Sequence, residues 1–361
     1  MTSPTEQLHA VGQSLWLDNI TRGILASGEL ARYLTDYTLT GLTSNPSIFD
    51  AAFTTTGDYD TAIAAGVKAG RTGEELFFDL AVEDLQAAAD IFRPVFDRTD
   101  GVDGWVSLEV SPLLAYDTNK TIEQATQLHT RADRPNLFIK IPGTPEGLPA
   151  VEEAIFRGIP VNVTLLFSAE QYRAAAEAYL RGVERRVEAG LNPSVGSVAS
   201  VFMSRWDAAV AGKVPPELTN RLAIAVGLQT YRVYRELLES PRFARLANYG
   251  ARMQRLLWAS TGTKDPNAPD TLYVSGLAAP FTVNTMPFKT IQAFADHGVV
   301  GEALPTDGGD SDATIAAFAA AGVDVTALAA TLQTDGAAAF VKSWNQLLDV
   351  VATKAANVAS V

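Results

Sequence analysis

Short apolar runs alternate with longer amphipathic stretches along almost the whole chain. Eight runs are mostly apolar on both faces and are predicted as strands, at residues 14–18, 38–43, 105–109, 137–141, 160–167, 197–202, 255–260 and 271–275. Continuous apolar runs are typical of parallel strands that are covered on both faces. Eight of them, each followed by a helix, favour a (β/α)8 TIM barrel with additional terminal helices over an open sheet.

Helix signals fit this alternation. Ser168 and Gln171 form a capping-box pattern ahead of an amphipathic stretch that stops at Gly190, and Thr72 with Glu75 forms another. The alternation of strands and helices is therefore locally consistent.

The alanine-rich tail predicts two more helices, at residues 313–322 and 328–356. The second could break near Asp335-Gly336, because glycine is a weak helix former. The chain shows neither a low-complexity linker nor a repeat of fixed period. We therefore expect one domain over residues 1–361, with the C-terminal helices of about residues 310–361 packed on the barrel.

Composition adds a cellular setting. The hydrophobic fraction of 47% is that of an ordinary globular protein. No apolar run approaches the roughly 18 residues that a membrane span needs. The first residues lack the basic start and apolar stretch of a secretory signal, so we expect a soluble protein of the cytoplasm, with no membrane partner.

The formal net charge of −13 opposes binding to nucleic acid, because a polyanion would gain nothing from counterion release. An anionic small substrate would need a local basic pocket. The chain has no cysteine and three scattered histidines, so neither a thiolate nucleophile nor a metal site is expected. Any chemistry must come from lysine, carboxylates and hydroxyls.

In a barrel of this kind, the active site lies at the C-terminal ends of the strands. Seven of the eight predicted strands end on, or are soon followed by, polar candidates: Asp18, Thr43, Asn45, Glu109, Lys140, Asn162, Thr164, Ser200, Arg205, Ser260 and Lys264. These side chains could converge on one cavity.

Lys140 is the least expected residue of this set, because its apolar strand neighbours leave it no solvated face. Burial disfavours the charged form of an amine. A neutral amine attacks a ketone, and the protonated imine that forms is an electron sink for breaking the next carbon–carbon bond, without metal or cofactor. Alternatively, Lys140 could reach solvent from the strand end or form a structural ion pair with Glu109.

The carboxylates have two readings each. Asp18 could take the hydroxyl proton that carbon–carbon cleavage releases, or it could cap the helix that follows. Glu109 could hold a water with Thr164 beside Lys140, or it could be a buried salt-bridge residue.

The remaining polar candidates are also ambiguous. An Asn-Pro turn is enough to explain Asn45. Arg205 and Lys264 follow the sixth and seventh strands, where many barrels bind phosphate, although either could be an ordinary solvated charge.

Together, these segments resemble the transaldolase family, and more closely its longer bacterial branch within the class I Schiff-base aldolase superfamily. The resemblance covers nearly the whole chain and is carried by WLDNI (16–20), GLTSNPSIF (41–49), SLEVSP (107–112), LFIKIPGTPEG (137–147), PVNVTLLFS (160–168), SVFMSRWD (200–207) and LLWASTGTKDP (256–266). It implies a single (β/α)8 barrel with the imine lysine on the fourth strand, where the strand count places Lys140.

The resemblance also implies roles for the other candidates. Asp18 would be the acid/base of bond cleavage, and Glu109 with Thr164 would hold the catalytic water. Asn45 and Asn162 would bind hydroxyls of the dihydroxyacetone unit, and Ser200 and Phe202 would line the pocket. Arg205 matches the phosphate-binding arginine of the family. Thr43 and Ser260 are further candidates for substrate binding because of their positions at strand ends. A second phosphate-binding arginine of other branches is absent after the seventh strand, and Lys264 is the expected substitute, although an ammonium cannot make a bidentate contact.

The implied reaction moves a dihydroxyacetone unit from sedoheptulose 7-phosphate to glyceraldehyde 3-phosphate, giving erythrose 4-phosphate and fructose 6-phosphate in the pentose phosphate pathway. One alternative is a fructose-6-phosphate aldolase, which releases free dihydroxyacetone and typically carries Gln where this chain has Glu109. Another is a non-catalytic barrel that binds phosphosugars. The family includes monomers and dimers, so either a monomer or a homodimer is expected.

Overall fold

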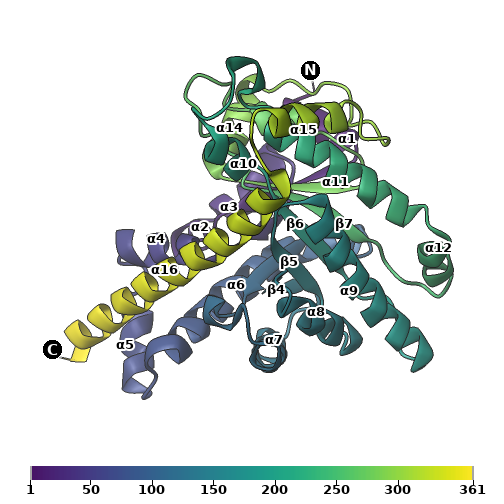
Figure 1. Ribbon diagram of the computed structural model, residues 1–361. Helices are drawn as coiled ribbons and strands as arrows, with labels where there is room; N and C mark the ends of the chain where they lie inside the picture. Colours follow the sequence, from purple (N-terminus) through teal and green to yellow (C-terminus); the bar gives the residue numbers. More distant parts are fainter. Residues whose placement is uncertain (1, 360–361) are drawn as a thin grey trace.

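The computed structural model describes residues 2–359 and contains a closed barrel of eight parallel strands surrounded by helices (Figure 1). The strands are β1 (Gln13–Asp18), β2 (Leu39–Thr43), β3 (Trp105–Glu109), β4 (Leu137–Pro142), β5 (Val161–Leu166), β6 (Ser197–Phe202), β7 (Gln254–Ala259) and β8 (Thr282–Met286). They pair in sequence order, and β8 closes on β1. The predicted TIM barrel is confirmed, and seven of the eight predicted strands lie within one residue of their observed bounds.

The eighth predicted strand is wrong. Residues 271–275 belong largely to helix α13 (Leu272–Gly276), and the true last strand begins at Thr282. The sequence of β8, TVNTM, looks too polar for a buried strand, yet all of it is buried. Its polar side chains find partners inside the barrel: the Thr282 hydroxyl accepts from Gln13 Nε2 at 2.9 Å, and Asn284 Oδ1 accepts from Thr261 Oγ1 at 2.8 Å.

Helices alternate with the strands, and further helices precede β1 and follow β8. Their bounds are α1 (Pro4–Ala10), α2 (Arg22–Ala26), α3 (Glu29–Asp36), α4 (Pro46–Thr55), α5 (Asp60–Lys68), α6 (Gly73–Arg98), α7 (Thr118–Ala132), α8 (Gly147–Phe156), α9 (Ala169–Glu188), α10 (Ser204–Val210), α11 (Leu222–Leu238), α12 (Pro241–Asn248), α13, α14 (Phe288–His297), α15 (Ser311–Ala320) and α16 (Val325–Ala359). Among residues 2–359, no single helix is long and apolar enough to cross a membrane, and only the α15–α16 pair, bent by 89°, reaches that composition together.

The two capping-box predictions have different outcomes. Ser168 caps α9 by accepting from the backbone N–H of Gln171 at 3.2 Å, and α9 ends just before Gly190, which has a positive φ of 69°. Thr72 does precede α6, but its side chain makes no capping hydrogen bond. Glu75 instead forms an ion pair with Arg71, so the second capping box is wrong.

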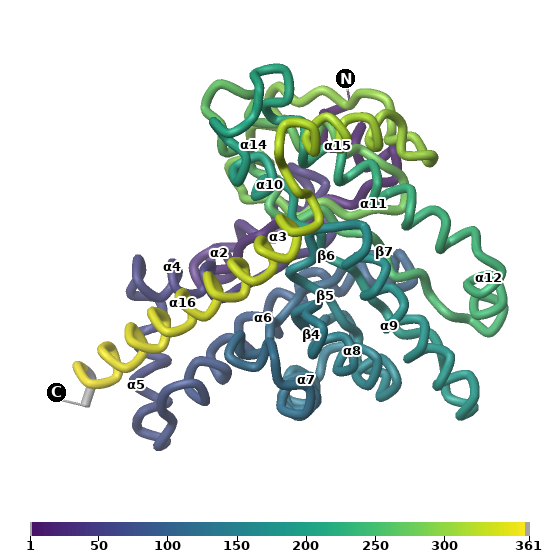
Figure 2. Tube along the Cα trace, viewed as in Figure 1, coloured from purple at the N-terminus to yellow at the C-terminus, as the bar shows by residue number. Residues whose placement is uncertain are grey.

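The C-terminal helix α16 runs without the predicted break. Figures 1 and 2 show it extending from the strands past α4 and α5, which it contacts together with α6. Gly336 lies on its buried face, where an added Cβ would come within 3.0 Å of Leu165 Cδ2. The glycine therefore marks a close approach between the helix and the barrel, and not a helix end.

Large side chains fill the barrel interior. Gly41 faces the ring of Trp16, which would lie 2.5 Å from an added Cβ, so only glycine fits there. At the N-terminal ends of the strands, the buried pair of Asp103 and Arg255, with an O···N distance of 3.1 Å, occupies the barrel centre. A cavity of about 620 Å³ borders this pair at the N-terminal ends. In barrels of this kind, however, the active site lies at the opposite, C-terminal ends of the strands.

Candidate active site

A cavity of about 190 Å³ lies at the C-terminal ends of the strands. Most of the residues predicted from strand ends line it: Asp18, Thr43, Asn45, Lys140, Ser200, Phe202, Arg205, Ser260 and Lys264. The other three predicted residues, Glu109, Asn162 and Thr164, are buried next to it on β3 and β5. The barrel thus brings the predicted set together at one end.

Lys140 lies on β4, beside Glu109 of β3 and Asn162 of β5 in strand register. Only 5% of the residue is exposed, so the alternative in which it reaches solvent is wrong. Its Nζ lies 3.3 Å from Glu109 Oε2 and donates a hydrogen bond to the backbone carbonyl of Ser44 at 3.2 Å. The predicted ion pair is therefore present, inside the barrel mouth.

The Glu109 carboxyl is almost completely buried. Burial raises its pKa, the attraction of Lys140 opposes that shift, and the negative charge of Asp18 adds to it. Within the part of the chain that the structure describes, neither carboxyl oxygen accepts a hydrogen bond of normal geometry, and the buried Thr164 hydroxyl has no partner either. Buried polar groups without protein partners are typical sites for ordered water.

Asp18 ends β1 and accepts a hydrogen bond from the Thr43 hydroxyl at 2.7 Å. Desolvation raises its pKa, and both Lys140 and the Thr43 hydroxyl oppose that shift. The next helix, α2, is capped by the Thr21 side chain. The reading of Asp18 as a helix cap is therefore wrong.

Two asparagines and a serine form a polar group beside Lys140. Asn162 donates from Nδ2 to Ser107 Oγ at 3.1 Å and accepts from Ser200 Oγ at 2.7 Å, which fixes its amide orientation. Asn45 Oδ1 accepts from the backbone N–H of Ile48 at 3.1 Å and caps α4. The Asn-Pro pair thus begins a helix and not the predicted turn, and Asn45 also lines the cavity.

Arg205 and Lys264 provide positive charge at the rim. Arg205 is partly buried in α10, its pKa is lowered by desolvation, and its Cζ lies 4.9 Å from the centre of the Phe202 ring. Lys264 is exposed on the loop after β7. That loop begins at Ser260, whose left-handed φ of 55° turns the chain out of the strand.

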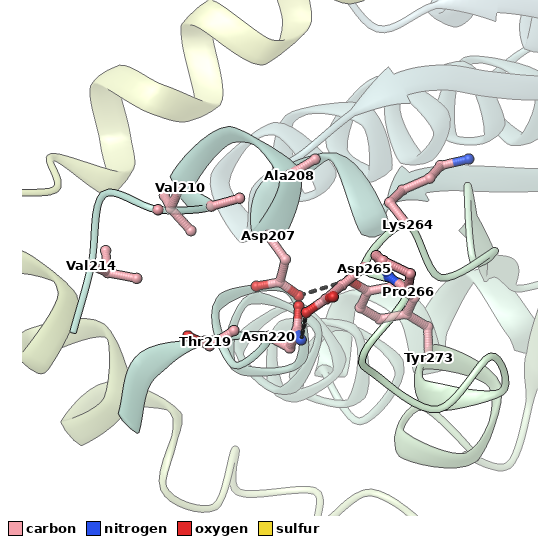
Figure 3. Close-up of a pocket in the computed structure, with 12 residues that line it drawn as sticks. Asp207, Ala208, Val210, Val214, Thr219, Asn220, Lys264, Asp265, Pro266 and Tyr273 are labelled. Atoms are coloured by element: carbon pink, nitrogen blue, oxygen red, sulfur yellow. Dashed lines mark hydrogen bonds between the residues drawn. The ribbon is translucent and has the colours of Figure 1, made fainter. Parts of the chain in front are cut away.

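Lys264 also borders a neighbouring cavity of about 410 Å³, drawn in Figure 3. Its side chain points away from the carboxylates of this second cavity (Figure 3). Those carboxylates have structural partners. Asp265 accepts from Asn220 Nδ2 at 2.7 Å, and Asp207 accepts from the backbone N–H of Leu222 at 3.0 Å. The loop that carries Lys264 is therefore tied, through Asp265, to the segment just before α11.

Further residues of the cavity wall were not predicted from the sequence: Ser47, Ala259, Gly262, Thr285, Pro287 and Phe340. Thr285 is the penultimate residue of β8, the strand that was misplaced in sequence, so a correct eighth strand would have revealed it. Phe340 comes from α16, and no local signal in an alanine-rich helix links it to the barrel mouth.

Comparison with known proteins identifies the family. A family model described as transaldolase/fructose-6-phosphate aldolase matches residues 15–351. The chain is similar to a transaldolase of Arthrobacter sp. (strain FB24), at 45% identity over 96% of both chains, and to one of Thermobifida fusca (strain YX), at 46% identity over 99% of both. It is also 44% identical to a transaldolase of Mycobacterium bovis (strain BCG / Pasteur 1173P2), over 94% of both chains. The chain therefore belongs to the transaldolase/fructose-6-phosphate aldolase family and is a transferase of the transaldolase kind.

Proposed function

We propose that this enzyme transfers a dihydroxyacetone unit between phosphosugars through an imine on Lys140. The observation that carries the proposal is a buried amine at the wall of the cavity, 3.3 Å from one carboxylate and close enough to Asp18 to shift its pKa. An amine nucleophile, a candidate base and a carboxylate that could hold water therefore lie together at one barrel mouth.

The first half-reaction forms and uses the imine. The Lys140 amine adds to the ketone of the donor, and loss of water from the carbinolamine gives the protonated imine. Asp18 then takes the proton of the hydroxyl on the carbon to be released, the adjacent carbon–carbon bond breaks, and the imine nitrogen takes up the electron pair. An aldose phosphate leaves, and an enamine of dihydroxyacetone stays bound to Lys140.

The second half-reaction reverses these steps with a new aldose. The enamine carbon attacks the aldehyde of the acceptor, and protonated Asp18 returns its proton to the new hydroxyl. Water then hydrolyses the imine and frees the product. Glu109 and Thr164 would hold that water, and their buried oxygens without protein hydrogen bonds support this role.

The proposed substrates are sedoheptulose 7-phosphate and glyceraldehyde 3-phosphate, and the products are erythrose 4-phosphate and fructose 6-phosphate of the pentose phosphate pathway. Substrate hydroxyls would meet the polar lining of the cavity at Thr43, Asn45, Ser200 and Ser260, with Asn162 next to Ser200 and Phe202 as an apolar wall. Arg205 and Lys264 would bind the phosphate, because they are the cations at the rim besides Lys140.

Borohydride trapping tests the imine. Wild-type enzyme is incubated with fructose 6-phosphate and borohydride, and the peptide containing Lys140 is examined by mass spectrometry. We expect a reduced dihydroxyacetone or hexose adduct on Lys140 and none in Lys140→Arg, which keeps the positive charge. An adduct on another lysine, or no adduct, would rule out the mechanism.

A second experiment separates transfer from aldol release. With fructose 6-phosphate alone, the enzyme should release little free dihydroxyacetone, and added erythrose 4-phosphate should start rapid transfer. Fast release without an acceptor would favour the aldolase alternative. A trapped adduct together with any turnover would exclude the non-catalytic barrel.

We also propose that residues 1–361 form one domain that works in the cytoplasm, as a monomer or homodimer. The packing of α16 supports the single domain, because Leu332, Phe340 and Trp344 on that helix belong to the same apolar core as the barrel strands. Phosphosugar substrates support the location, since they are intermediates of central metabolism.

A further inference from the structure

One face of α16 approaches Arg205, at the rim of the cavity, through two residues that are one helical turn apart. Phe340 is buried, lines the cavity, and has its ring centre 6.0 Å from Arg205 Cζ. Gly336 precedes it by four residues, and an added Cβ there would lie 3.0 Å from Arg205 Nη1. Residues spaced by four share a helix face, so both contact the same guanidinium.

The glycine fits a packing requirement. Glycine in a helix interior costs roughly 1 kcal/mol relative to alanine, and α16 is otherwise rich in alanine in this stretch. Alanine would place a methyl group against Arg205 Nη1. Gly336 therefore opens the space that the arginine occupies.

Arg205 is held by aromatic rings and not by a carboxylate. Its Cζ lies 4.9 Å from the Phe202 ring centre and at the outer limit of a cation–π contact with Phe340. No ion pair joins Arg205 to a carboxylate within residues 2–359. Rings orient a guanidinium without adding negative charge, and they leave its N–H groups free for bidentate binding of an anion.

We propose that Phe340 is a positioning residue that, with the space opened by Gly336, orients Arg205 toward the phosphate of the substrate. The inference rests on the proposed function, because it takes Arg205 as the phosphate ligand. The Phe340 ring also faces Lys140, with Nζ 5.9 Å from its centre. One side chain of the C-terminal helix thus lies between the cation of the imine end and the cation of the phosphate end.

The test compares two acceptors that differ only in the phosphate. Sedoheptulose 7-phosphate is the donor, and kcat/KM is measured for glyceraldehyde 3-phosphate and for glyceraldehyde. In a two-step transfer, this ratio reports the acceptor half-reaction alone. For Phe340→Leu, which removes the ring and keeps apolar bulk, we expect a loss of roughly five- to tenfold with glyceraldehyde 3-phosphate. The loss with glyceraldehyde should stay below about twofold, because that acceptor makes no use of Arg205.

Three further variants make the result specific. Phe340→Tyr keeps an aromatic face and should retain the phosphate preference. Gly336→Ala keeps Phe340 but crowds Arg205, and it should show the same selective loss. Val341→Ala, a change on the same helix away from the cavity, should leave both acceptors unaffected.

A double-mutant comparison shows whether Phe340 acts through Arg205. In an Arg205→Ala background, Phe340→Leu should cause no further loss with glyceraldehyde 3-phosphate, because its effect acts through the arginine. Equal losses for both acceptors, or independent effects of Phe340 and Arg205, would overturn the proposal. Either of two other results would instead refute the proposed function. The first is a wild-type enzyme that forms no adduct on Lys140, and the second is an Arg205→Ala variant that keeps the wild-type preference for the phosphorylated acceptor.

Discussion

At the scale of single residues, the ionisation of Asp18 depends on a balance that can be tested. Burial raises its pKa, while Lys140 and the Thr43 hydroxyl lower it again. Asp18 must be ionised to accept a proton, so the transfer rate should rise with pH through this raised pKa. The acidic limb of the pH–rate profile is therefore expected above the ordinary pKa of an aspartate.

Thr43→Val tests that balance. Removing the hydroxyl that donates to Asp18 at 2.7 Å should move the acidic limb of kcat to higher pH. Thr43→Ser keeps the donor and should keep the wild-type limb. The pKa of the neighbouring Glu109 carboxyl is also raised by burial, and Asp18→Asn identifies the Asp18 limb by abolishing it. An unchanged limb in Thr43→Val would contradict this role of Asp18.

Lys264 is the second residue that a single substitution can examine. If its ammonium binds phosphate, Lys264→Ala should lower kcat/KM for glyceraldehyde 3-phosphate roughly tenfold or more, which is typical of a lost charged hydrogen bond. Lys213→Ala removes the same charge from exposed surface nearby and should change little. Similar losses in the two variants would mean that Lys264 contributes only to the overall electrostatic potential of the surface and does not contact the phosphate.

Most candidate site residues could be predicted because their signal is local. Lys140 lies in an apolar strand, and Asp18 ends one, so the sequence around each already indicates its position at the barrel mouth. Phe340 could not be predicted in this way. Its place in the cavity depends on how α16 crosses the barrel, which is a tertiary contact without a local pattern.

At the scale of elements, the start of α11 depends on one buried carboxylate. Asp207 accepts from the backbone N–H groups of Leu222 and Ala223, at 3.0 and 3.3 Å, and from the Tyr273 hydroxyl at 2.8 Å. Asp207→Ala would leave three buried donors without partners, each costing about 1–3 kcal/mol. We expect a loss of about 3 kcal/mol or more in the free energy of unfolding, measured with urea.

An exposed helix cap provides the matched control. Asp117 caps α7 by accepting from the Lys120 N–H at 3.0 Å, and its removal should cost clearly less than that of Asp207 because the freed N–H can bond to water. Comparable losses at the two caps would show that the buried network around Asp207 adds nothing to an ordinary cap.

The last strand shows the limit of pattern reading for elements. A strand inside a barrel can carry polar side chains when neighbouring residues form hydrogen bonds with them. Gln13 does so for Thr282, and Thr261 does so for Asn284. Residues 271–275 were predicted as a strand because they are mostly apolar. Tyr273 and Val274 are indeed buried, but they lie in a short helix. Hydrophobicity indicated burial correctly and could not indicate which backbone conformation achieves it.

At the scale of the whole molecule, the C-terminal helix α16 packs against α4, α5 and α6, which lie in the first third of the chain. Trp344 is 1% exposed and packs against Phe77 and Phe78 of α6, with ring centres 5.0 and 5.5 Å away. Its indole N–H has no hydrogen-bond partner within residues 2–359, so its contribution comes from packing. The same helix carries Phe340, and the stability of this contact therefore bears on the site.

Trp344→Ala is expected to lower the free energy of unfolding by about 3–5 kcal/mol, the usual cost of removing a large buried aromatic side chain. Asn345→Ala, on the exposed face of α16, should cost nothing, because alanine is the better helix former. Urea unfolding followed by both far-UV circular dichroism and transfer activity would measure the loss. Coincident transitions at lower urea are expected if barrel and α16 unfold as one unit. Activity lost well before the circular dichroism signal would instead show that α16 detaches from an intact barrel, and the single-domain proposal would have to be withdrawn.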